Sequence, residues 1–400
     1  MHIAIVSPYP PSITGIGQYG YHISRLLAQS GMFTRISILT GGSSNTTAIA
    51  SQRNITIKTT WEAGDLNSWW KISSDLQSLR PDLVWFNLGA SVFGRSPLAN
   101  LAGFLSPFMA RSLGIPTVVT LHELVEQADL AGLKSPGGPL APFGARLLTL
   151  GALQADVVCL TMKQHVDWLS KHHNGKKSIH IPIGAYYKPE ILVRPADLPR
   201  ELLFFTTLAP FKGLELLLQA FQQLQTTRPD LHLTIAGVPH ARFPGYEAEL
   251  KLNFSHLSNL SWLGSVPEAQ VRDLFQQAEI VCIPYTATTG SSSVLYQAAM
   301  WGRAIVASDL AETKAVARES NLEAAFFQSG SSSSLAAVLK ELLDSPELQK
   351  EQVRRNFAAI QHHRPEEICR IYLQAFNLAL ETSNSPKRLA IPGLANRELS

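Results

Sequence analysis

Short apolar runs alternate along most of the chain with longer stretches in which apolar residues recur every three or four positions. The short runs are typical of strands buried on both faces, and the longer stretches are typical of amphipathic helices. In the first half this pattern predicts strands at 2–7, 36–40, 83–87, 117–121 and 157–160, and helices at 17–30 and 162–171. Such alternation indicates a parallel sheet covered by helices.

The same pattern restarts at residue 201, after a proline-rich stretch. It predicts strands at 202–206, 231–236, 260–263, 280–284 and 304–307, and helices at 213–225, 268–277, 291–301, 311–318, 335–343, 346–361 and 365–382. The predicted fold class is therefore α/β, with two Rossmann-like domains whose parallel sheets face each other across a cleft. We expect domains at 1–190 and 201–364, a linker at 191–200, a closing helix at 365–382 that could return to the first domain, and a loose tail at 383–400.

Composition narrows the class of protein. With 400 residues, 45% of them apolar and 16% charged, the chain can bury large cores, and neither disorder nor a membrane span is indicated. The N-terminus lacks the basic start of a signal peptide, and the three cysteines are scattered, as expected of buried thiols in a reducing compartment. These features favour a cytoplasmic protein.

Charge is divided unevenly along the chain. Up to residue 195 there are 16 Lys and Arg against 10 Asp and Glu, and the remainder has 18 against 21. The basic first half lacks an arginine-rich helix or an aromatic RNA-binding signature. We therefore expect an anionic ligand or the inner face of a membrane as its partner, and no nucleic acid.

One βαβ unit, from Tyr285 to Asp309, suggests a phosphate site. A strand ends in a turn of glycine and serine, a helix follows and closes at Gly302, and a second strand begins at once. Such a turn places backbone N–H groups and hydroxyls at the positive end of a helix dipole. An ordinary helix cap would account for the same serines, and both roles can hold together.

Two other motifs are misleading. GIGQYG, from Gly15 to Gly20, fits a dinucleotide-binding pattern, but it follows the strand only after YPPSIT, and no carboxylate ends the second strand near Thr40. HELVE, from His122 to Glu126, has half of a zinc-protease motif, without its second histidine and after a strand. We expect neither a nicotinamide cofactor nor a metal site.

The order of motifs in the second half is more specific. TTLAPFKGLELLLQAF, LHLTIAG, WLGSVPEAQVRDLFQQAEIVCIPY and QAAMWGRAIVASD follow one another. In the order and spacing of these motifs, the chain resembles the group 1 (family four) retaining glycosyltransferases, which have the two-domain GT-B fold and use nucleotide-diphosphate sugars. The resemblance covers about residues 1 to 380. The resemblance implies a hexosyltransferase that moves a sugar to an acceptor hydroxyl with retention of configuration.

The resemblance also implies roles for particular residues. Lys212 matches the lysine that neutralises the donor diphosphate, and His122 matches a histidine that faces the donor sugar and the acceptor, with Glu123 as the acidic residue beside it. Further donor contacts are implied at the glycine loop and the serine turn: Gly15, Gly17, Gly290, Ser291, Ser292 and Ser293.

Three positions depart from the family pattern. Two glutamates, one for the sugar hydroxyls and one for the ribose, are replaced by Thr289 and Gln297, and an arginine that contacts the diphosphate is replaced by Thr207. Gln297 can still hydrogen-bond a ribose, but more weakly than a carboxylate. The alternative is a non-catalytic nucleotide-sugar-binding or partner protein of the same fold. A dinucleotide oxidoreductase, and a sugar epimerase or phosphorylase on this fold, are further rivals.

Cofactors and the acceptor follow from the same resemblance. We expect no cofactor and no obligatory metal, because Lys212 with a helix terminus can replace a cation. The expected partners are a nucleotide-sugar donor and a glycan or lipid-linked acceptor. The stretches 91–114 and 130–150 are rich in Leu, Phe, Pro and Gly, with interspersed Arg95, Arg111, Lys134 and Arg146. They fit either ordinary packing or a peripheral membrane contact.

Overall fold

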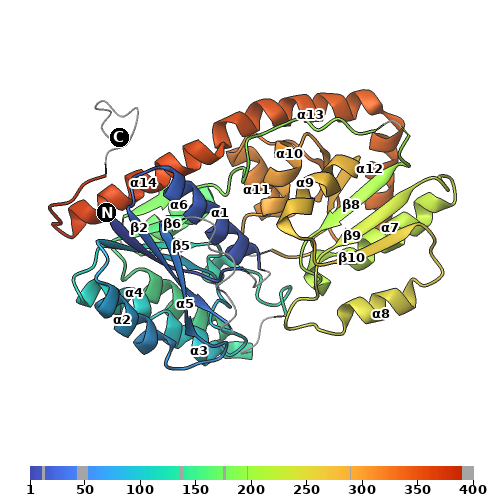
Figure 1. Cartoon of the computed structure of the whole chain (residues 1–400). Coiled ribbons are helices and arrows are strands. Elements are labelled where there is room, and N and C mark those ends of the chain that lie inside the picture. Colours follow the sequence, from blue (N-terminus) through green and yellow to red (C-terminus); the bar gives the residue numbers. More distant parts are fainter. Residues whose placement is uncertain are drawn as a thin grey trace. The chain divides into compact units, whose positions relative to one another are not determined.

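The computed structural model describes residues 1–10, 14–42, 53–134, 138–173, 177–195, 197–288 and 290–389. The chain divides into two compact units. Unit 1 comprises 1–128, 136–182 and 365–400, and unit 2 comprises 129–135 and 183–364. Both units contain one parallel sheet with helices, as the alternating pattern predicts (Figure 1).

Unit 1 is built on a seven-stranded parallel sheet of order β3-β2-β1-β4-β5-β6-β7. Its strands are β1 (His2–Val6), β2 (Arg35–Gly41), β3 (Ile55–Trp61), β4 (Leu83–Leu88), β5 (Thr117–Leu121), β6 (Val157–Leu160) and β7 (Ser178–His180). Its helices are α1 (Gly15–Gln29), α2 (Ser68–Leu79), α3 (Pro97–Gly103), α4 (Ser106–Ser112), α5 (Ala141–Ala152), α6 (Lys163–His172) and α14 (Pro365–Thr382).

Unit 2 is built on a six-stranded parallel sheet of order β10-β9-β8-β11-β12-β13. Its strands are β8 (Glu201–Phe205), β9 (His232–Ala236), β10 (Leu260–Gly264), β11 (Ile280–Ile283), β12 (Ala304–Ser308) and β13 (Ala325–Phe327). Its helices are α7 (Leu214–Gln225), α8 (Tyr246–Asn253), α9 (Glu268–Gln277), α10 (Ser293–Met300), α11 (Ala311–Glu319), α12 (Ser332–Asp344) and α13 (Pro346–Ile360).

The side chains of β4 point alternately into two packed layers of unit 1. Val84 and Phe86 join the core beneath α2 to α5, whereas Trp85 lies against the rings of Tyr372 and Phe376 from α14. The helices α2 to α5 therefore cover one face of the sheet, and α1 and α14 cover the other (Figure 1). These aromatic contacts hold the C-terminal helix in unit 1.

The segment expected to be a linker is packed on unit 2. The buried guanidinium of Arg303 donates to the Leu192 carbonyl, and Gln276 donates to the Val193 carbonyl at 3.0 Å. Glu190 N–H donates to Met300 O at 2.9 Å, at the end of α10. Residues 183–195 thus belong structurally to the second unit.

The expected loose tail is wrong for residues 383–389, the part that the structure describes. Leu389 is buried, and its backbone N–H and C=O both bond the Asn377 side chain, at 2.8 and 2.9 Å. Lys387 pairs with Asp82. The tail therefore packs along α14 and onto the sheet of unit 1.

Two further observations concern the cysteines and the apolar character of the helices. Cys159, Cys282 and Cys369 are free and buried, as their apolar surroundings predict. No helix in the described ranges combines the length and the apolar character needed to cross a bilayer.

Candidate active site

The strand ends of unit 1 bring His122 and the start of α1 together. His122 directly follows β5, and Asn87 lies near the end of the neighbouring β4. The Nε2 atom of His122 is 2.6 Å from Asn87 Oδ1. The Asn87 amide nitrogen in turn donates to Ser7 Oγ and to the Ile16 carbonyl, both at 2.9 Å. One asparagine thus links three strand ends to the first turn of α1.

These bonds define the form of the His122 ring. Because both Asn87 donors are used on Ser7 and Ile16, Asn87 Oδ1 accepts, so His122 carries its proton on Nε2. Burial lowers the pKa of His122 from 6.5 to about 3. His122 is therefore neutral near pH 7, with an unprotonated Nδ1 that can accept a hydrogen bond from a ligand hydroxyl.

Tyr19 holds the other side of His122. Its ring meets the imidazole edge-on, with centroids 4.7 Å apart, and its hydroxyl is 2.9 Å from that of Tyr372. The Tyr372 hydroxyl is also 3.0 Å from Thr120 Oγ1, and Trp85 Nε1 donates to the same Thr120 oxygen at 2.9 Å. The C-terminal helix thus supports the side chain that packs against His122.

The glycines of GIGQYG lie inside α1 instead of in a loop before it. The helix begins at Gly15, and Gly17 N–H donates to the side chain of Thr14, the N-cap residue. Gly20 is the glycine that close approach requires, because a Cβ there would lie 2.3 Å from Ser7 Oγ. The predicted helix start at residue 17 is therefore late by two positions.

The acidic residues of HELVE have structural partners. Glu123 Oε2 accepts from Ala90 N–H at 3.1 Å and so fixes the turn after β4. Glu126 lies 3.1 Å from His173 Nε2, and both side chains are largely buried. Among the described residues, no group of three or more His, Cys, Asp and Glu side chains is placed to hold a metal ion.

Unit 2 brings Lys212 to the turn after β11. Lys212 ends a short 3-10 turn, Pro210–Lys212, and its Nζ lies 3.9 Å from the centre of the Tyr285 ring. The Phe211 carbonyl accepts from Thr286 N–H at 2.9 Å. Gly213 has φ 70°, and a Cβ there would lie 1.7 Å from the Pro284 carbonyl oxygen. Glycine is required at 213 for both reasons, and it lets the two turns touch.

The serine turn leads into α10, which starts at Ser293, two residues later than the pattern predicts. Ser292 is the N-cap residue but makes no side-chain cap bond, and its hydroxyl is 3.4 Å from that of Tyr285. The buried Ser291 Oγ has no hydrogen-bond partner among the described residues. An ordinary cap therefore does not account for these hydroxyls.

The remaining donor-site predictions have different outcomes. Gln297 is only 7% exposed and lies within α10. Gly290 N–H is 3.4 Å from Thr288 Oγ1. Thr207 is half-buried, directly before the bonded segment that starts at Leu208. Thr289 lies outside the described residues.

Sequence reasoning missed Asn87, Tyr19 and Tyr285 as site residues. Asn87 had a usable signal, because a polar residue near the end of a buried parallel strand lies where such sheets bind ligands. Tyr19 and Tyr285 had no comparable signal, since an aromatic residue in an apolar pattern is indistinguishable from core. Gly17 and His122 belong to unit 1, and Lys212 and the serine turn belong to unit 2.

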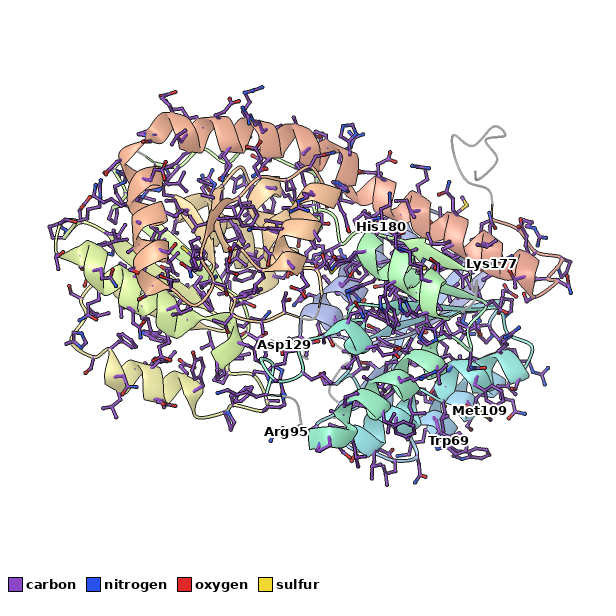
Figure 2. All side chains as sticks on the ribbon, turned by 180° about the vertical axis from the view of Figure 1, so that it is seen from behind. Trp69, Arg95, Met109, Asp129, Lys177 and His180 are labelled. Carbon is purple, nitrogen blue, oxygen red and sulfur yellow. The ribbon has the colours of Figure 1, made fainter. Side chains whose placement is uncertain are left out.

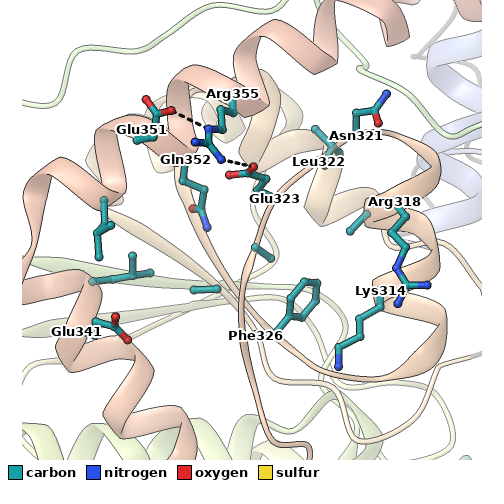
Figure 3. Close-up of a pocket in the computed structure, with 15 residues that line it drawn as sticks. Lys314, Arg318, Asn321, Leu322, Glu323, Phe326, Glu341, Glu351, Gln352 and Arg355 are labelled. Atoms are coloured by element: carbon teal, nitrogen blue, oxygen red, sulfur yellow. Dashed lines mark hydrogen bonds and ion pairs between the residues drawn. The ribbon is translucent and has the colours of Figure 1, made fainter.

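A separate cavity of about 960 Å³ lies elsewhere in unit 2, beside β13 (Figure 3). Arg355 lines it and is paired with Glu323 and Glu351, at 2.9 and 2.7 Å. Lys314 and Phe326 line its other side. None of the predicted site residues lines this cavity.

Comparison with known proteins agrees with this geometry. Residues 199–345 match the family model of the glycosyl transferases group 1. Among curated proteins, the chain is similar to lipopolysaccharide 1,2-N-acetylglucosaminetransferase of Salmonella typhimurium (30% identical over 112 residues, 27% of this chain and 29% of that protein) and to phosphatidyl-myo-inositol mannosyltransferase of Mycolicibacterium smegmatis (33% over 102 residues, 25% of each). The chain thus spans only about a quarter of the length of these two relatives.

Solved structures match over nearly the whole chain. HepE of Anabaena, in complex with UDP-glucose, has a TM-score of 0.71 and 16% identity, covering 94% of this chain and 98% of that one. The galactosyltransferase WaaB, which acts on the lipopolysaccharide outer core, has a TM-score of 0.60 and 14% identity, covering 96% and 99%. Residues 199–345 are thus similar to the group 1 glycosyl transferases, and the two parallel sheets of the chain are those of the GT-B fold.

Proposed function

We propose that this protein transfers a hexose from a nucleotide-diphosphate sugar to an acceptor hydroxyl, with retention of anomeric configuration. The observation that carries the proposal lies within the family match of unit 2. Lys212 Nζ lies 3.9 Å from the centre of the Tyr285 ring, and the Tyr285 hydroxyl is 3.4 Å from that of Ser292, the N-cap residue of α10. Anions bind well where a cation and a helix N-terminus meet. HepE, which shares the fold, binds UDP-glucose.

The proposed roles follow from the chemistry of the side chains. Lys212 stabilises the charge that develops on the leaving diphosphate, and the serine turn adds backbone and hydroxyl donors. The Gln297 amide bonds the ribose in place of a carboxylate. The bond from the anomeric carbon to the phosphate breaks while the bond to the acceptor oxygen forms on the same face, and the acceptor proton passes to the leaving phosphate.

No metal ion takes part in the proposed reaction, since Lys212 and the helix terminus supply the positive charge. Activity should therefore survive treatment with EDTA. Loss of activity on chelation, restored by Mg²⁺ or Mn²⁺, would contradict this part of the proposal.

The acceptor that we propose is a glycan or a lipid-linked acceptor. Two similar proteins are named for such acceptors, a lipopolysaccharide and phosphatidyl-myo-inositol. In unit 1, the neutral His122 offers Nδ1 as an acceptor for a sugar or acceptor hydroxyl.

The test is a donor panel with a matched pair of variants. Purified protein should hydrolyse at least one nucleotide sugar slowly, and Lys212→Met should lower that rate by about 10²-fold, the loss typical for one charge-stabilising group. Lys314→Met is the control, because Lys314 also belongs to unit 2 and lies over an aromatic ring, that of Phe326, at 5.7 Å. Equal rates for the two variants would refute the role of Lys212.

A non-catalytic nucleotide-sugar binder is the second candidate. The neutral amide of Gln297, where the family has a carboxylate, favours it. Saturable nucleotide binding without hydrolysis or transfer across the whole donor panel would support this candidate over the enzyme.

A further inference from the structure

Large apolar side chains are exposed mainly on one helical layer of unit 1. Of the sixteen large hydrophobic residues exposed in the described chain, ten lie between Leu66 and Leu150. These ten are Leu66, Trp70, Leu98, Leu105, Phe108, Leu113, Leu140, Phe143, Leu147 and Leu150. They belong to α2, α3, α4 and α5 or to the residues beside them. We call the outer surface of these four helices the α2–α5 face.

Helix α5 exposes large apolar side chains. Its fully buried residues are small, namely Ala145, Thr149 and Ala152, and Leu148 is partly buried against the core of unit 1. Its large residues Phe143 and Leu147 point outward and are 63% and 37% exposed. A helix that needed only the core of unit 1 would place its bulky apolar side chains inward. The outer stripe of α5 is therefore built for a partner outside the unit.

The other helices extend this stripe into a surface. Helix α4 exposes Phe108, with Leu105 and Leu113 at its two ends, and α2 exposes Trp70 at 59%. The four helices contact one another in pairs, α2 with α4 and α3 with α5 among them. Figure 2 shows Trp69 of α2 and Met109 of α4 near each other on this layer. The exposed side chains thus belong to one layer of contacting helices instead of being scattered over the unit, as single surface hydrophobics usually are.

On α3, α4 and α5 the charge of this face has one sign, whereas α2 carries both signs, with Asp75 paired to Lys58. No Asp or Glu occurs from residue 83 to 122, nor from 130 to 155, whereas Arg95, Arg111 and Arg146 all fall within these stretches. Arg95 and Arg146 are exposed and have no ion pair with any described residue, while Arg111 pairs with Asp156 at 3.2 Å. A protein partner would usually meet charges of both signs, but an anionic lipid surface fits a face that is apolar and basic.

We propose that the α2–α5 face docks this protein on a membrane that contains anionic lipids. Phe, Leu and Trp side chains enter the interfacial layer, and Arg95 and Arg146 contact lipid phosphates. The attachment is peripheral. Docking does not depend on glycosyl transfer, so it is tested separately from the proposed reaction. If both proposals hold, the face brings unit 1 to lipid-linked acceptors.

Vesicle flotation tests the docking. The full chain should float with vesicles of phosphatidylcholine containing phosphatidylglycerol, and far less with phosphatidylcholine alone. The double variant Phe143→Ser/Leu147→Ser should lower the partition coefficient at least tenfold. The matched control is Leu252→Ser/Leu348→Ser, two exposed leucines of unit 2, which should change it less than twofold. Arg95→Gln and Arg146→Gln should each lower it about fivefold.

The outcomes separate the alternatives. Weaker flotation at higher salt, together with unchanged nucleotide binding by the Phe143→Ser/Leu147→Ser variant, would support docking through this face. No flotation on anionic vesicles would overturn the proposal. So would dimerisation of the wild-type chain that the double variant abolishes, since the face would then be an interface between two copies. Loss of flotation in both double variants would also overturn it.

Discussion

Acidification tests the environment assigned to His122. Its imidazole is buried, it donates from Nε2 to Asn87 at 2.6 Å, and its pKa is lowered from 6.5 to about 3. The unfolded chain therefore binds this proton between those two pH values and the folded chain does not. Because the unfolded state binds more protons, the contribution of His122 to the free energy of unfolding is fully present above pH 6.5 and is lost as the pH drops. At about pH 4.5 the loss from this one group is ~3 kcal/mol.

Two measurements check this reasoning. In histidine-labelled protein, the NMR signal that disappears in His122→Gln should keep its neutral, Nε2-protonated shifts down to below pH 5. In urea unfolding followed by a probe in unit 1, wild type should lose ~3 kcal/mol more than His122→Gln between about pH 7.5 and pH 4.5. His165, whose pKa burial lowers to about 4, is present in both proteins, so its contribution cancels. An assigned His122 pKa above 6 would refute the description of the site.

Three further predictions concern both units. Gly213→Ala should destabilise unit 2 by roughly 2 kcal/mol or more, seen as a lower Tm, because φ is 70° and the Pro284 carbonyl leaves no room for a Cβ; an unchanged Tm would contradict the backbone approach. Tyr372→Phe removes hydrogen bonds at 2.9 and 3.0 Å and should cost about 1–2 kcal/mol in unit 1, with the Phe376→Leu variant as a packing comparison. Gln297→Leu should weaken nucleotide binding about tenfold without lowering the Tm, because leucine fills the same buried position but lacks the amide that we propose bonds the ribose; a lower Tm with intact binding would assign Gln297 to the core.

The strands buried on both faces of a sheet were predictable, because such strands are apolar along their whole length whatever segments lie beside them. Strands β5 and β6 coincide with the predicted ranges 117–121 and 157–160, since both are continuous apolar runs buried on two faces. Strand β3 was missed, because ITIKTTW lies at the edge of the sheet and exposes polar side chains. Residues 329–334 look like a polar turn, yet α12 begins at Ser332, where Ser331 caps the helix.

Other features could not be read from the sequence because they depend on tertiary contacts. Helix α5 was not predicted, because apolar residues occur on its exposed as well as its buried side and leave no continuous polar face that would mark it as amphipathic. The tail was expected to be loose, because nothing in its sequence reveals that Asn377 bonds the backbone of Leu389. For the site, Lys212 and Gln297 come from motif order, whereas the link from His122 to Ile16 through Asn87 required coordinates.

The state of His122 limits the mechanism that we propose. A group whose pKa is about 3 and whose Nε2 proton is held by Asn87 cannot serve as an efficient general base near pH 7. The carboxylate beside it, Glu123, already accepts from Ala90 N–H. In a retaining transfer the acceptor proton then has to pass to the leaving diphosphate, and Lys212 stabilises the negative charge that develops there. The rate should therefore respond strongly to Lys212→Met and should show no titration of His122 between about pH 5.5 and pH 8.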